Sequence, residues 1–140
     1  MKKLHDLRDY LLTSPLGLTA DKLLTFALSG KVTSYAGLPH QNRSFRVAYQ
    51  AHVIVTDFAG DETALMYLVT DWVQRNQPGA APDAVSFQLD IISHRQVDLS
   101  ILVALEEVVA VQQQEAGTRL TPLGDGNALA GSLFGVIPRP

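Results

Sequence analysis

The residues of this sequence best suited to metal binding or proton transfer are its four histidines, His5, His40, His52 and His94. None of them lies three or four positions from another histidine, so a helical turn cannot bring two of them to one metal ion. His52 is expected on the solvent-facing side of a strand, and His94 in a tight turn. We therefore interpret them as surface residues and expect no metal site.

Two short glycine-rich segments resemble catalytic or phosphate-binding motifs only superficially. Residues 131–135 (GSLFG) have the wrong order for the Gly-x-Ser-x-Gly turn that holds a catalytic serine, and no strand precedes them. Residues 124–131 (GDGNALAG) lack the lysine of a P-loop, and their glycine spacing misses the dinucleotide-binding pattern. We expect no catalytic residue and no bound cofactor.

Two pairs of carboxylates remain as candidates for acid–base chemistry. Asp57 and Asp61 flank a turn between a strand and a helix, where a turn role and a helix-capping role account for both. Glu106 and Glu107 are consecutive in a strand, so their side chains point to opposite faces of the sheet and cannot act together. The sequence therefore predicts that the protein is not an enzyme.

The overall composition is that of an ordinary globular domain. The net charge is −3, which argues against the basic surface that nucleic-acid binding needs. There are no cysteines, so disulfides and thiolate chemistry are excluded. Acidic and basic residues interrupt the first twelve residues, so we expect no secretory signal. No apolar run approaches the roughly 20 residues that span a bilayer, so no membrane partner is expected.

The clearest structural signal is a change of hydrophobic period in the middle of the chain. Residues 45–55 are apolar at alternate positions, which predicts a strand with one buried face. From Asp61 the apolar residues recur at helical spacing until Gln77 and Pro78, where proline ends the pattern. Trp72 falls on the apolar face of this helix and is expected to be buried.

The other predicted elements are a helix to about residue 13, a second helix over 19–30, a weak edge strand over 31–38, and strands over 85–93 and 97–111 joined by a hairpin. This order, α-α-β-β-α-β-β, predicts an α+β domain over residues 1–116, in which helices pack on one face of an antiparallel sheet of about four strands. Residues 117–140 hold five of the ten glycines and three of the seven prolines, so we expect a C-terminal arm there.

Residues 53–61 (VIVTDFAGD), followed by 72–78 (WVQRNQP), resemble the tail completion protein R family of contractile-tailed temperate phages. The residues that carry the family signature are Asp57, Phe58, Gly60, Asp61, Trp72, Asn76, Gln77 and Pro78. The resemblance implies a structural protein that caps the head-proximal end of the tail tube and sheath and prepares it for head joining. Similar tail terminators are small α+β domains that form a six-fold ring.

The resemblance also implies the partners and the location. The partners would be other copies in a hexameric ring, the tube and sheath proteins and a head–tail connector. The location would be a virion tail or a headless, phage-tail-like bacteriocin, assembled in the cytoplasm of the host bacterium. Candidate interface residues are Ile54, Ile92 and Leu102 on the outward face of the strands, His94 and Arg95 in the hairpin, and Phe134 in the arm. The alternative is a non-catalytic binding module for a peptide or a small ligand.

Overall fold

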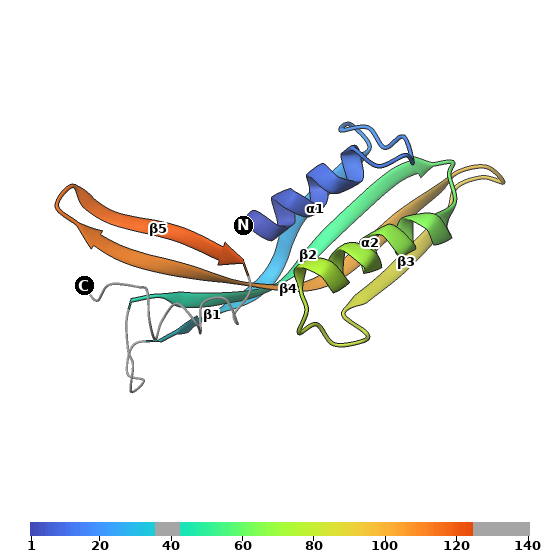
Figure 1. The fold of residues 1–140 in the computed structure, drawn as a ribbon. Helices are drawn as coiled ribbons and strands as arrows, with labels where there is room; N and C mark the ends of the chain where they lie inside the picture. The colour runs from blue at the N-terminus through green and yellow to red at the C-terminus, as the bar shows by residue number, and fades with distance from the viewer. Residues whose placement is uncertain (36–42, 125–140) are drawn as a thin grey trace.

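The computed structural model describes residues 1–35 and 43–124, which form two helices and one antiparallel sheet. The elements are α1 (Lys2–Leu12), β1 (Leu23–Ser34), β2 (Phe45–Phe58), α2 (Glu62–Asn76), β3 (Val85–Ile91), β4 (Val97–Gln114) and β5 (Gly117–Gly124). The strand order is β1-β2-β4-β3, and β5 pairs with the distal part of β4. The predicted α+β class and antiparallel sheet are confirmed (Figure 1).

The core lies where the two helices meet the inward-facing residues of the sheet. Along β2 the buried residues alternate from Tyr49 to Val55, as the period of two predicts. Buried residues from both helices and from the central strands form one cluster, which includes Leu7, Leu11, Leu65, Val69, Trp72, Val53, Val55, Leu99 and Ile101. Beyond this cluster, the β4–β5 hairpin and the adjoining ends of β1 and β2 extend past the helices (Figure 1).

The helix that the sequence predicts over residues 19–30 is not present, because these residues lead into strand β1. Leu23 pairs with Val55 and Ala27 with Ala51, so β2 supplies the backbone hydrogen bonds that a helix would otherwise make internally. A bulge falls between Ala27 and Ser29 and shifts the alternation of the strand. The edge strand predicted over 31–38 therefore begins earlier, and its last three residues lie outside the described residues.

The remaining predicted boundaries agree closely with the structure. Helix α1 ends at Leu12, and α2 begins after Asp61, whose carboxylate accepts a hydrogen bond of 2.9 Å from the Thr63 N–H. At the hairpin between β3 and β4, the N–H groups of Ile92 and Ser93 both donate to the Gln96 carbonyl.

The expected C-terminal arm begins differently from the prediction, since its first eight residues form strand β5 (Gly117–Gly124). This strand runs antiparallel to β4, with Gln114 opposite Gly117 at the turn. The φ angle of Gly117 is 137°, a backbone conformation that glycine adopts readily. Pro122 argued against a strand when the sequence was considered alone, although an edge strand tolerates proline. Residues 125–140, including the candidate interface residue Phe134, lie outside the described residues.

The burial of Trp72 leads to a test of the core. The Trp72 side chain is 4% exposed, so Trp72→Ala is expected to lower the free energy of unfolding by about 3–5 kcal/mol in urea denaturation. Tyr67 lies on the same helix but is 67% exposed, so Tyr67→Ala should change that free energy by less than about 0.5 kcal/mol. Equal losses from the two variants would contradict this placement of the core.

Candidate assembly surfaces

The first part of the signature forms the turn between β2 and α2. Asp57 has a φ of 50°, in the left-handed region that aspartate tolerates better than most residues. Its N–H donates to a carboxylate oxygen of Asp98 at 2.9 Å. Phe58 is buried, and its ring lies so close to Gly60 that an added Cβ would stand 2.7 Å from Phe58 Cζ. These residues therefore fix the geometry of the turn.

The second part of the signature lies at the C-terminal end of α2. Trp72 is buried, and the Asn76 side chain donates to the Trp72 carbonyl at 2.9 Å. The buried side-chain oxygen of Gln77 accepts two hydrogen bonds, from Lys3 Nζ at 2.7 Å and from the Glu106 N–H at 3.1 Å. One amide therefore connects the end of α2 with α1 and β4, and the exposed Pro78 follows directly.

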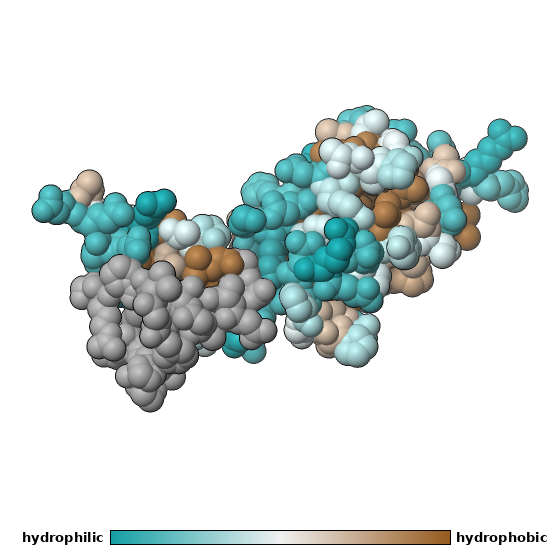
Figure 2. Space-filling view, in the orientation of Figure 1, coloured by the Kyte–Doolittle hydropathy of each residue, from teal (hydrophilic) through white to brown (hydrophobic). Residues whose placement is uncertain are grey.

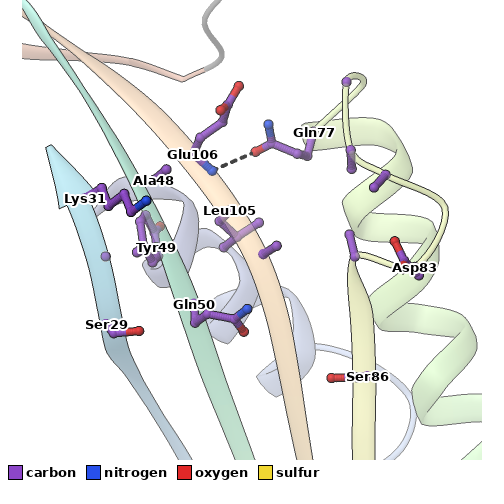
Figure 3. Close-up of a pocket in the computed structure, with 16 residues that line it drawn as sticks. Ser29, Lys31, Ala48, Tyr49, Gln50, Gln77, Asp83, Ser86, Leu105 and Glu106 are labelled. Atoms are coloured by element: carbon purple, nitrogen blue, oxygen red, sulfur yellow. Dashed lines mark hydrogen bonds between the residues drawn. The ribbon is translucent and has the colours of Figure 1, made fainter. Parts of the chain in front are cut away.

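Gln77 occupies a gap along one side of β4 (Figure 3). Pairing with β3 stops near Val103, and the Ala104 N–H then donates to the Ala84 carbonyl at 3.0 Å. Pairing with β5 starts only at Val108. The Glu106 N–H lies between these two pairings, and the Gln77 side chain is its acceptor.

Glu107 is a buried residue whose role sequence analysis missed. Its carboxylate accepts hydrogen bonds from the Lys2 N–H at 2.8 Å and from the Tyr49 hydroxyl. Helix α1 has no side-chain cap of its own, so a carboxylate from β4 satisfies its first turn. The sequence could have predicted its burial, because Glu107 lies two residues after Leu105 in the strand and therefore faces inward as Leu105 does.

The outward face of the sheet carries two of the predicted interface residues side by side. Ile54 pairs with Ser100 and Leu102 with His52, so Ile54 and Leu102 are diagonal neighbours on this face. His52 shares a short hydrogen bond with the Ser100 hydroxyl. The predicted solvent-facing position of His52 is thus correct, although its side chain is only half-exposed.

The other predicted interface residues lie apart from this pair. Ile92 follows the end of β3, beyond the pairing of Asp90 with Asp98, and is exposed. His94 and Arg95 are exposed in the same turn. The structure therefore divides the predicted interface stripe into a sheet-face part and a turn part.

Strand β1 supplies two residues to the outward face that sequence analysis did not include. Leu24 lies opposite Ile54, and Phe26 lies opposite His52 with the two ring centroids 4.9 Å apart. We call the set Leu24, Phe26, Ile54 and Leu102 the outward patch. Half of it was hidden in the sequence because residues 19–30 were assigned to a helix.

Next to the outward patch, the same face is hollowed into an open groove (Figure 3). Its volume is about 730 Å³, and its walls come from four strands and from the loop between α2 and β3. The polar lining residues include Ser29, Lys31, Gln50, Asp83 and Glu106. A groove of this size can accept a peptide segment or a small molecule. Figure 2 shows, in one view, hydrophobic residues at the helical end of the surface interspersed with hydrophilic ones.

Neither a metal cluster nor a membrane-spanning helix occurs in the described part of the chain. Across residues 1–35 and 43–124, no three histidine, aspartate or glutamate side chains are grouped so that they could hold a metal ion. No helix in these ranges has both the length and the apolar character needed to cross a bilayer.

Comparison with known proteins assigns the chain to a family. The model of the family described as P2 phage tail completion protein R (GpR) matches residues 1–124. The chain belongs to this family. It is also 28% identical over 111 residues to the tail completion protein R of Escherichia phage P2, covering 75% of this chain and 70% of the relative. No solved structure matches the chain. Membership of the family places the protein in phage tail completion and in the virion tail.

The Gln77 linkage predicts a loss of stability that depends on the side-chain oxygen. Gln77→Ala removes the acceptor of the Glu106 N–H and is expected to lower the free energy of unfolding by about 1–3 kcal/mol. Gln77→Glu keeps an oxygen in place and should lower the free energy of unfolding by less. Chemical denaturation of both variants provides the measurement, and a larger loss for Gln77→Glu would show that the oxygen is not what matters.

The buried Tyr49 hydroxyl predicts a dependence of stability on alkaline pH. Burial, together with the hydrogen bond to Glu107, raises the pKa of Tyr49 well above the ordinary value of 10. Above pH 10 the unfolded chain releases this proton and the folded chain keeps it, so the stability gained from Tyr49 is lost as the pH rises. The advantage of the wild type over Tyr49→Phe should shrink by about 1.4 kcal/mol per pH unit there. Urea denaturation between pH 9 and 11 tests this, and parallel slopes would refute it.

Proposed function

We propose that this protein caps the head-proximal end of the tail tube and sheath and prepares that end for head joining. The family match over residues 1–124 carries the proposal, because it spans all of the described structure. In this proposal the protein acts through its surfaces and not through catalysis. Its partners are other copies in a ring, the tube and sheath proteins and a head–tail connector.

The structure supports a contact role for the outward face of the sheet. Helices α1 and α2 cover the inward face, whereas the outward patch on the other face carries large apolar side chains with Leu24 more than half exposed. Exposed apolar groups of this kind mark interaction surfaces. The outward patch is therefore the first surface that we assign to the end of the tail.

The local contacts of the acidic residues support a structural and not a catalytic function. Glu107 is occupied by the first turn of α1 and by Tyr49, and Asp61 by the cap of α2. Asp57 serves the turn before α2. Of the residues that sequence analysis considered for acid–base work, Glu107, Asp61 and Asp57 thus have roles in holding the fold together.

The groove beside the outward patch favours a second candidate function, that of a non-catalytic binding module. Its lining places Lys31 and Asp83 on opposite walls, so both charges of a zwitterionic ligand, or the single charge of a peptide terminus, find a partner (Figure 3). In the setting of a tail, the peptide would be a segment of a neighbouring tail protein. The particle would be a contractile phage or a headless bacteriocin of similar build.

The test uses tails assembled in cells that lack this protein. Purified protein added to such tails is expected to appear in negative-stain images as density at one end only. Ile54→Lys/Leu102→Lys, which charges the outward patch, should reduce the fraction of occupied ends at least roughly tenfold, because burying an unpaired charge in an interface is costly.

The matched control adds the same two charges elsewhere. Tyr67 and Gln74 are both exposed on α2, so Tyr67→Lys/Gln74→Lys should occupy tail ends as the wild type does. Circular dichroism of each variant establishes that it is folded. Binding of the wild-type protein along the whole tail, or to no part of it, would count against the proposal.

A further inference from the structure

Exposed apolar side chains gather on two of the edge strands of the sheet, β1 and β3. Nine large hydrophobic residues are exposed in the described part of the chain, and six of them lie on β1, on β3 or directly after β3. These six are Leu24, Leu28, Val32, Phe87, Ile91 and Ile92. The order β1-β2-β4-β3 makes β1 and β3 the outer strands, and no other strand of the described residues pairs with their outer sides.

Both outer strands direct unpaired backbone groups away from the sheet. The Thr56 N–H donates to the Lys22 carbonyl at 3.0 Å, so the alternation of an antiparallel ladder turns the N–H and C=O of Thr25 outward from β1. In the same way, the bond from Ala104 to Ala84 turns the backbone groups of Phe87 and Leu89 outward from β3. Such edges pair readily with another strand unless charge, proline or a cover prevents it.

Arg8 donates to the outward-directed Leu23 carbonyl at 2.7 Å and covers the first residue of the β1 edge, but the rest of the two edges carries little of this protection. The twelve residues of β1 contain one charged side chain, Lys31, and the seven residues of β3 contain one, Asp90. Neither strand contains proline. The two charges have opposite signs and share the outward face, because Lys31 pairs with Ala48 and Asp90 with Asp98. With one charged side chain in each strand, charge does not block either edge from pairing with another strand.

Strand direction makes the two edges complementary. Neighbouring strands alternate in direction across β1, β2, β4 and β3, so β1 and β3 run in opposite directions. A second copy placed beside the first in the same orientation brings its β1 antiparallel to the first copy's β3. The sheet then continues from one copy into the next without any change of pattern.

We propose that copies of this protein join head to tail by pairing the β1 edge of one copy with the β3 edge of the next. This contact is heterologous, so repetition closes a ring or extends a filament. The inference rests on the proposed function, in which the protein acts as a ring, and adds to it the surfaces that make the ring. Self-pairing of β1 with β1, or of β3 with β3, is isologous and closes at two copies, so it does not build a ring.

The test charges each edge separately. Leu24→Lys/Val32→Lys blocks the β1 edge, and Phe87→Lys/Ile91→Lys blocks the β3 edge; all four side chains are more than half exposed, so folding should be retained. Analytical ultracentrifugation over a range of concentrations is expected to show self-association of the wild type. Each blocked variant should raise its dissociation constant roughly tenfold or more. The variant Tyr67→Lys/Gln74→Lys, off both edges, should associate as the wild type does.

Mixing the two blocked variants distinguishes the head-to-tail contact from a self-pairing. One variant keeps a usable β3 edge and the other a usable β1 edge, so their mixture should form a one-to-one dimer that neither forms alone. Dimers of the β1-blocked variant alone would indicate pairing of β3 with β3, and dimers of the β3-blocked variant alone would indicate pairing of β1 with β1. Either result overturns the inference.

A wild-type protein that stays monomeric up to its solubility limit, or a mixture that stays monomeric, overturns it as well. The wild-type protein is also added to tails that lack it. Binding at tail ends by a wild-type protein that does not self-associate would leave the proposed function intact and refute only the edge contact.

Discussion

The pairing of β2 with β4 is the constraint on which the rest of the structure depends. These two strands are paired from Phe45 opposite Val109 to Phe58 opposite Val97, and their inward residues provide much of the core. Because the antiparallel register fixes which side chains face inward, it also fixes where the helices can pack and which residues form the outward patch. Strands β1 and β3, both shorter than β2 and β4, then occupy the outer positions of this four-strand order.

Strand β4 is longer than β3, which pairs with only one end of it. This difference explains the two polar linkages in the fold, those of Gln77 and Glu107. Where β3 ends and β5 has not begun, a backbone donor of β4 needs a partner, and Gln77 provides it. One residue further, Glu107 turns inward beneath the start of α1 and accepts from its backbone. Both signature ends of α2 are therefore explained by the geometry of the fold, one as a turn and the other as a connection between elements.

The sequence predicted those parts of the fold that have a clear period and sharp ends. Strand β2, helix α2 and the hairpin before β4 are regular, and local residues such as Asp61 and Pro78 mark where they change. The prediction of a helix in place of strand β1 was wrong, because a bulge disturbs the alternation of the strand. Only its pairing with β2 shows that these residues are extended. Since Leu24 and Phe26 of the outward patch come from that strand, the sequence predicted only the other half of the patch. Glu107 was overlooked because its partners come from distant positions in the chain.

Strand β4 runs without interruption from the core into the β4–β5 hairpin, and this continuity has a mechanical consequence. The hydrogen bonds between β4 and β2 lie perpendicular to the strands. A pull on the hairpin along the direction of β4 therefore loads many of these bonds together in shear, whereas a pull at right angles would open them one after another. A part attached to the hairpin would transmit tension into the core along the direction in which the sheet is stiffest.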